Sequence, residues 1–328
     1  MQERSGFVIA LYLLSGLFAL SSAKADEFPE FNRDPAQARI VTEDLDRFWA
    51  AWDRAEQEPE RRREIFQQDY LDAGSPGLQS FVELRIQDVD RLLATIDHHR
   101  EYYAALRVRM QELPALTEPV REGFFKLKDM LPEAVFPDTY LLIGAMNSAG
   151  TIHLEGLLIG VEMHGLTPAT NLDGMSQWHR SVLKPMDEIP VIIMHELMHF
   201  QQINLSRTSF NTLLGQSIYE GAADFLAELV LDRHINQHLH DWALPREAEL
   251  WAEFKTQMHD EDHSEWLYNG TRTVDRPADL GYFIGYRIVQ AYYEQADDKQ
   301  QAIREILAMT DPKALLDVSG YGPVPDGP

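Results

Sequence analysis

The spacing of apolar residues predicts helices through the first third of the chain. From Val41 to Leu131, apolar side chains recur at intervals of three and four residues, which is the period of a helix with one buried face. The longest such run extends from Val89 to Leu113. A Gly- and Pro-containing stretch at 73–77 separates two of the helices. Residues 26–137 are therefore predicted to form a helical N-terminal layer.

The pattern changes after residue 137. Two runs rich in β-forming residues, Tyr140–Ala145 and Thr151–Val161, predict strands, and the turn-forming residues 147–150 join them as a hairpin. These runs carry the only convincing strand pattern in the sequence. The fold is therefore predicted to be α+β, mostly helical, with one small β-sheet.

Helical spacing returns in the second half of the chain. Pro190 fits the first turn of a helix, where its missing N–H costs nothing, and this helix should run to Gln202. Further helices are predicted over Leu213–Leu231, Ala248–Met258, Gly281–Gln295 and Gln301–Met309. The polar stretch 259–281 between them is a long loop of the kind that often borders a site. The Gly- and Pro-rich residues 319–328 predict a flexible tail.

The first 25 residues have the pattern of a secretory signal peptide. Arg4 precedes an apolar run from Phe7 to Leu20, and small residues follow up to Ala25. We expect cleavage after Ala25 and export to the periplasm or the medium. An uncleaved membrane anchor is the alternative, although the run is shorter than the ~20 residues that span a bilayer. No later stretch is long and apolar enough, so no integral span is expected after removal of the leader.

Composition narrows the chemistry. The formal net charge of −24 argues against nucleic acid and anionic membranes as partners, because both would be repelled. The chain has no cysteine, so it forms no disulfide and carries no lipid on an N-terminal cysteine. Any zinc ligands must then be histidines and carboxylates.

The most suggestive motif is IMHELMHFQQ at residues 193–202, and the rest of the chain must decide what it means. Side chains four apart share one face of a helix, so His195 and His199 could bind one metal ion while Glu196 lies beside it. That is the geometry of a metallopeptidase helix. The apolar residues 191–194 that precede the motif fit a helix driven into a core.

A third ligand is needed, because a catalytic zinc takes three protein ligands and leaves a fourth position for water. Glu220 lies on the next predicted helix, and Asp224 follows it by one turn. Two helices that pack antiparallel would bring Glu220 onto the metal, and Asp224 could then accept the spare N–H of His195 or His199. The alternative is that both carboxylates belong to an ordinary solvated helix face.

These residues carry a resemblance. HELMH with a downstream EGAAD resembles the gluzincin peptidases, the thermolysin-like branch of the zincins. The ordered segments QQDYLDAGSPGLQSF, GLLIGVE, HELMHFQQ, YEGAADFLAEL, GYFIGYRIVQAYYE and SGY resemble a bacterial family of predicted zinc-dependent proteases related to gliding-motility lipoprotein B. The resemblance covers most of the chain and implies a zincin-like catalytic region at 138–318. The chain departs from the lipoprotein relatives by lacking a cysteine for lipidation, which puts membrane anchoring in doubt.

Several further residues are candidates for contact with a substrate. The phenol of Tyr282, or alternatively of Tyr286, could donate to a developing oxyanion, although both could equally be packing residues. Arg287 could bind a substrate carboxylate. The strand around Gly156, Leu157 and Leu158 resembles the edge strand along which zincins hold an extended peptide, and a buried core strand is its alternative.

The sequence thus predicts an exported zinc-dependent peptidase that acts on a peptide or protein substrate. Zinc would polarise the scissile carbonyl and lower the pKa of a water, and Glu196 would pass that water's proton to the leaving amine. The rival hypothesis is a non-catalytic envelope scaffold or interaction protein that zinc only stabilises. Retention of Glu196 favours the enzyme, because a structural site has no use for an unligated base. The oligomeric state is not predicted.

Overall fold

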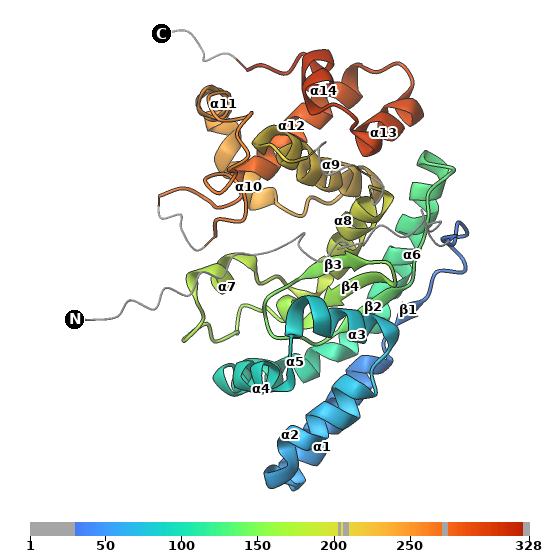
Figure 1. Cartoon of the computed structure of the whole chain (residues 1–328), viewed down its shortest axis with the longest axis vertical. Coiled ribbons are helices and arrows are strands. Elements are labelled where there is room, and N and C mark those ends of the chain that lie inside the picture. The colour runs from blue at the N-terminus through green and yellow to red at the C-terminus, as the bar shows by residue number, and fades with distance from the viewer. Residues whose placement is uncertain (1–29, 203–204, 206–209, 271–274, 324–328) are drawn as a thin grey trace, which may run out of the picture. The chain divides into compact units, whose positions relative to one another are not determined.

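A small mixed sheet and the long helices that pack on it organise the fold (Figure 1). The computed structural model describes residues 30–202, 205, 210–270 and 275–323. From Phe31 onward the chain forms one compact unit. The prediction of a mostly helical α+β protein with one small sheet is confirmed.

The sheet has four strands in the order β1-β2-β4-β3. β1 pairs in parallel with β2, β2 pairs in parallel with β4, and β3 runs antiparallel to β4. Every side chain of β2 and β4 is buried, so helices and loops cover both faces of the inner strands. The bounds of the strands are β1 (Ile40–Val41), β2 (Thr139–Leu142), β3 (Gly150–His153) and β4 (Gly156–Gly160).

The hairpin differs from its prediction. The expected single strand over Thr151–Val161 is broken by a turn at residues 154 and 155, and its two halves, β3 and β4, form the hairpin with each other. The run 140–145 supplies β2, which pairs with β4 and not with β3. The sequence also gave no sign of β1, because two residues are too few to show an alternating pattern.

The expectation of an edge strand around Gly156, Leu157 and Leu158 is wrong. These residues begin β4, which pairs with β2 on one side and with β3 on the other. Leu157 and Leu158 are fully buried. A peptide cannot add to a strand whose two edges are already paired. Among the described strands, β3 is the one that ends the sheet on this side.

The N-terminal layer is helical, as predicted, and is tied to the sheet by tyrosines. The hydroxyl of Tyr70 donates to the carbonyl of Ile143 at 2.5 Å, and that of Tyr103 donates to the carbonyl of Gly144 at 2.7 Å. Both acceptors lie just after β2. The helices are α1 (Glu43–Gln57), α2 (Arg62–Ile65), α3 (Pro76–Phe81), α4 (Val89–His98), α5 (Arg100–Arg109) and α6 (Leu113–Met130), with π-helical turns at Phe66–Asp72 and Val82–Ile86.

Three long helices form the core of the second half. They are α8 (Ile189–Gln201), α9 (Leu213–Leu231) and α12 (Leu280–Gln295), and they confirm the predicted helices at those positions. α9 packs against both α8 and α12. A Cβ on Gly285 would lie 1.7 Å from the carbonyl oxygen of Ser217, and one on Gly221 would lie 2.1 Å from the amide nitrogen of Tyr286. Only glycine lets α9 and α12 approach so closely.

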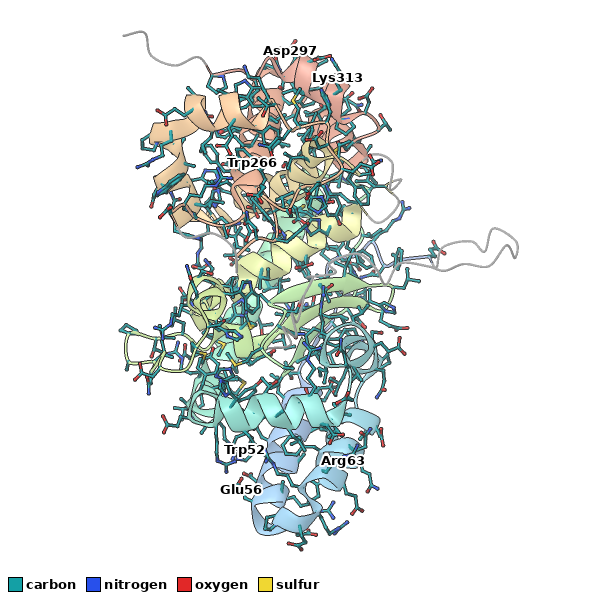
Figure 2. All side chains as sticks on the ribbon, turned by 60° about the vertical axis from the view of Figure 1, so that its left-hand side comes forward. Trp52, Glu56, Arg63, Trp266, Asp297 and Lys313 are labelled. Carbon is teal, nitrogen blue, oxygen red and sulfur yellow. The ribbon has the colours of Figure 1, made fainter. Side chains whose placement is uncertain are left out.

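Shorter elements complete this half. They are α7 (Gln177–Val182), α10 (Gln237–Ala243), α11 (Glu247–Phe254), α13 (Lys299–Ala308) and α14 (Pro312–Ser319). Trp266 is fully buried and packs edge-to-face against the ring of Phe254 in α11 (Figure 2). Tyr321, inside the predicted flexible tail, packs on the ring of Trp251 and donates to Glu247 at 3.0 Å. Within the described part of the chain, no helix is long and apolar enough to cross a membrane.

Candidate metal centre

Two histidines of α8 face each other across one turn of the helix. His195 and His199 are four residues apart, and their Nε2 atoms lie 3.0 Å from each other. All residues of α8 except Gln201 are buried, so the helix carries its polar side chains into the core. A helix this apolar explains why the motif lies inside the protein and not on its surface.

Glu220 of α9 completes the cluster. Its Oε2 lies 3.1 Å from His199 Nε2 and 3.7 Å from His195 Nε2. Among the described residues, these three side chains form the only group of three or more that could hold a metal ion, with their ligand atoms within 4.8 Å of one another. The three residues are 3 to 6% exposed. The structure therefore brings together the three residues that the sequence singled out as ligands.

The remaining ring nitrogens are held by hydrogen bonds. His195 Nδ1 lies 2.8 Å from Asp224 Oδ1, so Asp224 stands where the sequence analysis placed it. His199 Nδ1 lies 2.9 Å from Gln202 Oε1. Gln202 was not predicted, although its position three residues past His199 at the end of the same helix could have revealed it.

These bonds fix where each imidazole carries its proton. An ionised Asp224 only accepts, and Gln202 turns its amide nitrogen toward the carbonyl of Tyr219 at 3.4 Å, so both Nδ1 atoms are donors. Both Nε2 atoms then present lone pairs to each other and to the carboxylate of Glu220. Such a set of two imidazole nitrogens and one carboxylate fits a zinc ion. Three neighbouring acceptor atoms repel one another unless a cation or a proton lies between them.

The titration of the cluster reflects the same arrangement. Burial alone would lower the pKa of His195, but the hydrogen bonds of Asp224 and Glu220 raise it to about 10. Burial also opposes ionisation of Glu220, yet His199 and His195 outweigh it and hold the pKa of this carboxyl well below its ordinary value. These shifts favour a proton shared within the cluster, and a cation bound by the same atoms would compete with that proton.

Glu196 lies beside the cluster and does not belong to it. Its side chain is 7% exposed, and burial raises its pKa. A Cβ on Gly150, the first residue of β3, would lie 2.6 Å from Glu196 Oε1. Arg85, 8% exposed, donates to Thr151 Oγ1 of β3 at 2.9 Å, and its charge acts on Glu196. Arg85 was not predicted, because nothing in the sequence links it to residues so far along the chain.

Of the two candidate tyrosines, Tyr282 lies by the cluster. Its ring stacks beside that of His195 with centroids 6.4 Å apart. Tyr286 instead donates its hydroxyl to Glu228 at 2.6 Å, so its partner lies outside the His-His-Glu cluster. Arg287, the candidate contact for a substrate carboxylate, pairs with Glu247 at 2.7 Å.

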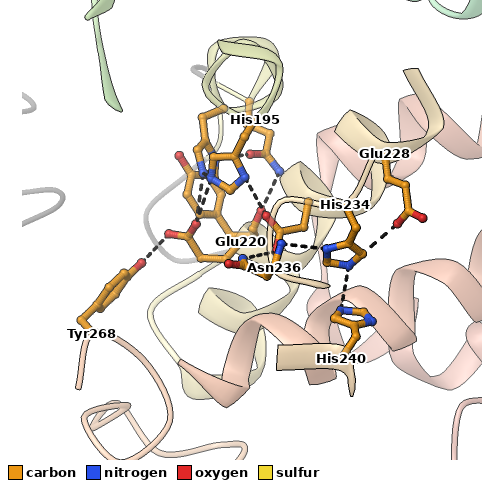
Figure 3. A network of polar contacts seen from close by, with 11 residues as sticks. His195, Glu220, Glu228, His234, Asn236, His240 and Tyr268 are labelled. Atoms are coloured by element: carbon orange, nitrogen blue, oxygen red, sulfur yellow. Dashed lines mark hydrogen bonds and ion pairs between the residues drawn. The ribbon is translucent and has the colours of Figure 1, made fainter. Parts of the chain in front are cut away.

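Tyr268 reaches the cluster from the long loop at 259–281. Its hydroxyl donates to Glu220 Oε1 at 2.5 Å (Figure 3). The same hydroxyl accepts from the amide of Gln216 at 2.7 Å. Burial and the charge of Glu220 raise the pKa of Tyr268 well above its ordinary value, so the phenol keeps its proton. The sequence indicated that this loop borders a site but did not single out the residue.

A second histidine pair lies near the cluster and has the opposite proton arrangement. His234 Nε2 lies 2.9 Å from His240 Nε2, while the backbone N–H of Asn236 donates to His234 Nδ1 at 2.8 Å (Figure 3). His234 must therefore carry its proton on Nε2, which leaves it no lone pair for a metal. Asn236 also donates to Asp224 Oδ2 at 2.7 Å and so joins the two pairs.

The fold and the site define a class: a mostly helical α+β protein with a buried His-His-Glu cluster between two packed helices and a further buried glutamate beside it. The sequence profile of the family described as gliding motility protein GldB matches residues 32–323, and the chain belongs to this family. No curated protein and no solved structure matches the chain. The family is one of lipoproteins, which supports an exported protein.

Proposed function

We propose that this protein is a zinc-dependent peptidase with a zincin-like fold. One observation carries the proposal: Glu196 lies on the same helix as two ligands, buried beside the cluster, and is not part of it. A purely structural metal site would need the three ligands and no further carboxylate. A buried carboxylate next to a cation site suits a general base.

The residues divide the work. His195, His199 and Glu220 would hold the zinc, which supplies polarisation of the scissile carbonyl and acidification of a water. Glu196, buried beside the cluster, would act as the general base that takes a proton from the attacking water and returns it to the leaving amine. Tyr282, whose ring lies beside that of His195, is the candidate donor to the developing oxyanion.

The substrate would lie along β3. This strand is at the end of the sheet, and its first residue touches Glu196. An extended peptide added to β3 would form main-chain hydrogen bonds whatever its sequence, with its scissile bond near the base. β3 thus takes the role that the sequence analysis gave to residues 156–158.

The rival is a non-catalytic envelope protein that zinc stabilises. The burial of all three ligands favours it, because structural sites are closed and catalytic sites keep a position open for water.

Glu196→Gln separates the two. The amide is nearly isosteric and leaves both histidines in place, but it cannot accept a proton at neutral pH. We expect about one zinc per chain and an unchanged thermal midpoint in the variant, with hydrolysis of a broad peptide library lowered by at least ~10²-fold. Glu188→Gln, at the start of the same helix, is the matched control and should keep full activity. A wild-type protein that binds zinc and cleaves nothing would establish the scaffold.

We also propose that the chain is exported to the periplasm or the medium and that its leader is cleaved after Ala25. The pattern of residues 1–25 supports this, although these residues lie outside the described part of the structure. N-terminal sequencing of the mature protein tests the cleavage site.

A further inference from the structure

The two carboxylate oxygens of Glu220 have different surroundings. Oε2 faces the histidines, at 3.1 Å from His199 Nε2. Oε1 faces away from them and accepts the hydroxyl of Tyr268 at 2.5 Å. The carboxylate is therefore not free to rotate or to present both oxygens equally to an ion.

The hydroxyl proton of Tyr268 has one acceptor, Oε1 of Glu220. A phenol has a single O–H, and the oxygen of Tyr268 already accepts from Gln216 at 2.7 Å. Gln216 lies one turn before Glu220 on α9, so one helix carries both the group that orients the phenol and the group that receives its proton. The hydroxyl is thus a directed donor to Oε1.

The backbone at Tyr268 is held in a costly conformation. Its φ of 56° lies in the left-handed region, which a bulky residue rarely adopts, and Asp279 has a φ of 63°. Such conformations are unfavourable for residues with a side chain and persist only where the surroundings impose them.

A clasp between the loop and α12 imposes this conformation. The N–H of Asp279 donates to Asn269 Oδ1 at 2.9 Å, and the N–H of Asn269 donates back to Asp279 Oδ1 at 3.3 Å. The N–H of Gly281 also donates to the carbonyl of Trp266 at 2.8 Å, and the ring of Trp266 is fully buried (Figure 2). The loop is therefore anchored on both sides of Tyr268.

We propose that Tyr268 is a positioning residue, which occupies Oε1 of Glu220 so that Oε2 alone is offered to the metal. The hydrogen bonds of the clasp hold the backbone of Tyr268 in its unfavourable conformation and so keep the phenol in place. The hydrogen bond from Gln216 sets the direction of the phenol's proton. This inference rests on the proposed function, because it assigns a task to a residue around the proposed zinc site.

Tyr268→Phe tests the proposal, since it removes the hydroxyl and leaves the ring. Tyr286→Phe is the matched control, because it also removes a phenol that donates to a carboxylate, that of Glu228 at 2.6 Å, outside the three ligands. We expect Tyr268→Phe to lower the affinity for zinc by ~10- to 100-fold in chelator competition, and Tyr286→Phe to leave it within about twofold.

Two further readouts separate positioning from simple support of the loop. The cobalt-substituted Tyr268→Phe protein should show altered visible absorption bands, because a freed carboxylate changes the ligand geometry. The rise in thermal midpoint on adding zinc should shrink in Tyr268→Phe, and this rise can be measured even if the variant is less stable.

The outcomes are distinct. Unchanged zinc affinity and unchanged cobalt bands in Tyr268→Phe would overturn the inference and leave the peptidase proposal standing. An equal loss of affinity in both variants would show a general effect of stability and would also overturn it. A wild-type chain that binds no zinc would overturn both proposals.

Discussion

Glu162 is a buried carboxyl that the proposed chemistry does not use. It is fully buried just after β4, its Oε1 accepts from the N–H of Met146 at 3.2 Å, and its Oε2 has no hydrogen-bond partner among the described residues. Burial raises its pKa to about 7. An ionised Glu162 is therefore costly to the folded state.

This cost makes stability depend on pH with a definite sign. Because the pKa is higher in the folded state than the ordinary 4.5, the protonated form favours folding, and that advantage is lost as pH rises through about 7. Glu162→Gln cannot ionise. We expect the free energy of unfolding of the variant, relative to that of wild type, to increase by up to about 3 kcal/mol as the pH rises from 5 to 8. Urea titrations at several pH values measure the difference, with the exposed Glu60→Gln as control. A difference that does not vary with pH would contradict the prediction.

At the scale of single residues, the sequence predicted those site residues that lie on regular helices. His195 and His199 were found because residues four apart share a helix face, and Glu220 and Asp224 because they lie one turn apart on the next predicted helix. Tyr268 and Arg85 could not be found this way. They come from a loop and from a turn far along the chain, and only the fold brings them to the cluster.

At the scale of elements, the contact between β3 and α8 sets the place of the proposed base. A Cβ on Gly150 would lie 2.6 Å from Glu196 Oε1 and 2.7 Å from its Cγ. The end of a glutamate side chain can swing away at little cost to the fold, but it then leaves the position that catalysis requires.

Gly150→Ala should therefore separate folding from chemistry. We expect zinc content and thermal midpoint to stay close to wild type and peptide hydrolysis to fall by roughly 10-fold or more. Gly322→Ala is the control, because its added Cβ meets nothing closer than 3.9 Å. Full activity in Gly150→Ala would show that Glu196 does not need its observed position.

Long helices were the most predictable elements. α9 begins and ends at the predicted residues, Leu213 and Leu231, because nineteen residues give the pattern many repeats. The sheet was less predictable. The turn at residues 154 and 155 interrupts an apolar run without the Asn-Gly or Asp-Gly pair that marks a tight hairpin, and the pairing of β1 depends on a strand 99 residues away.

At the scale of the whole molecule, the proposed export rests on the signal-peptide pattern of residues 1–25. If the leader is removed as proposed, the mature protein begins at Asp26 and is recovered in the soluble exported fraction. N-terminal sequencing and cell fractionation check both points. An intact leader on membrane-bound protein would contradict the proposal and favour the uncleaved anchor.

The pairing of β1 with β2 also bears on how the molecule can be divided. Although the first 100 or so residues after Phe31 read as a helical layer, they contribute a strand to the sheet and two tyrosine hydroxyls to the backbone after β2. A fragment that began at Asp138 would leave the N–H and C=O groups along one side of β2 without partners, in a strand whose side chains are all apolar or uncharged. Such an edge invites intermolecular pairing and aggregation. The predicted catalytic region is thus not a separable module.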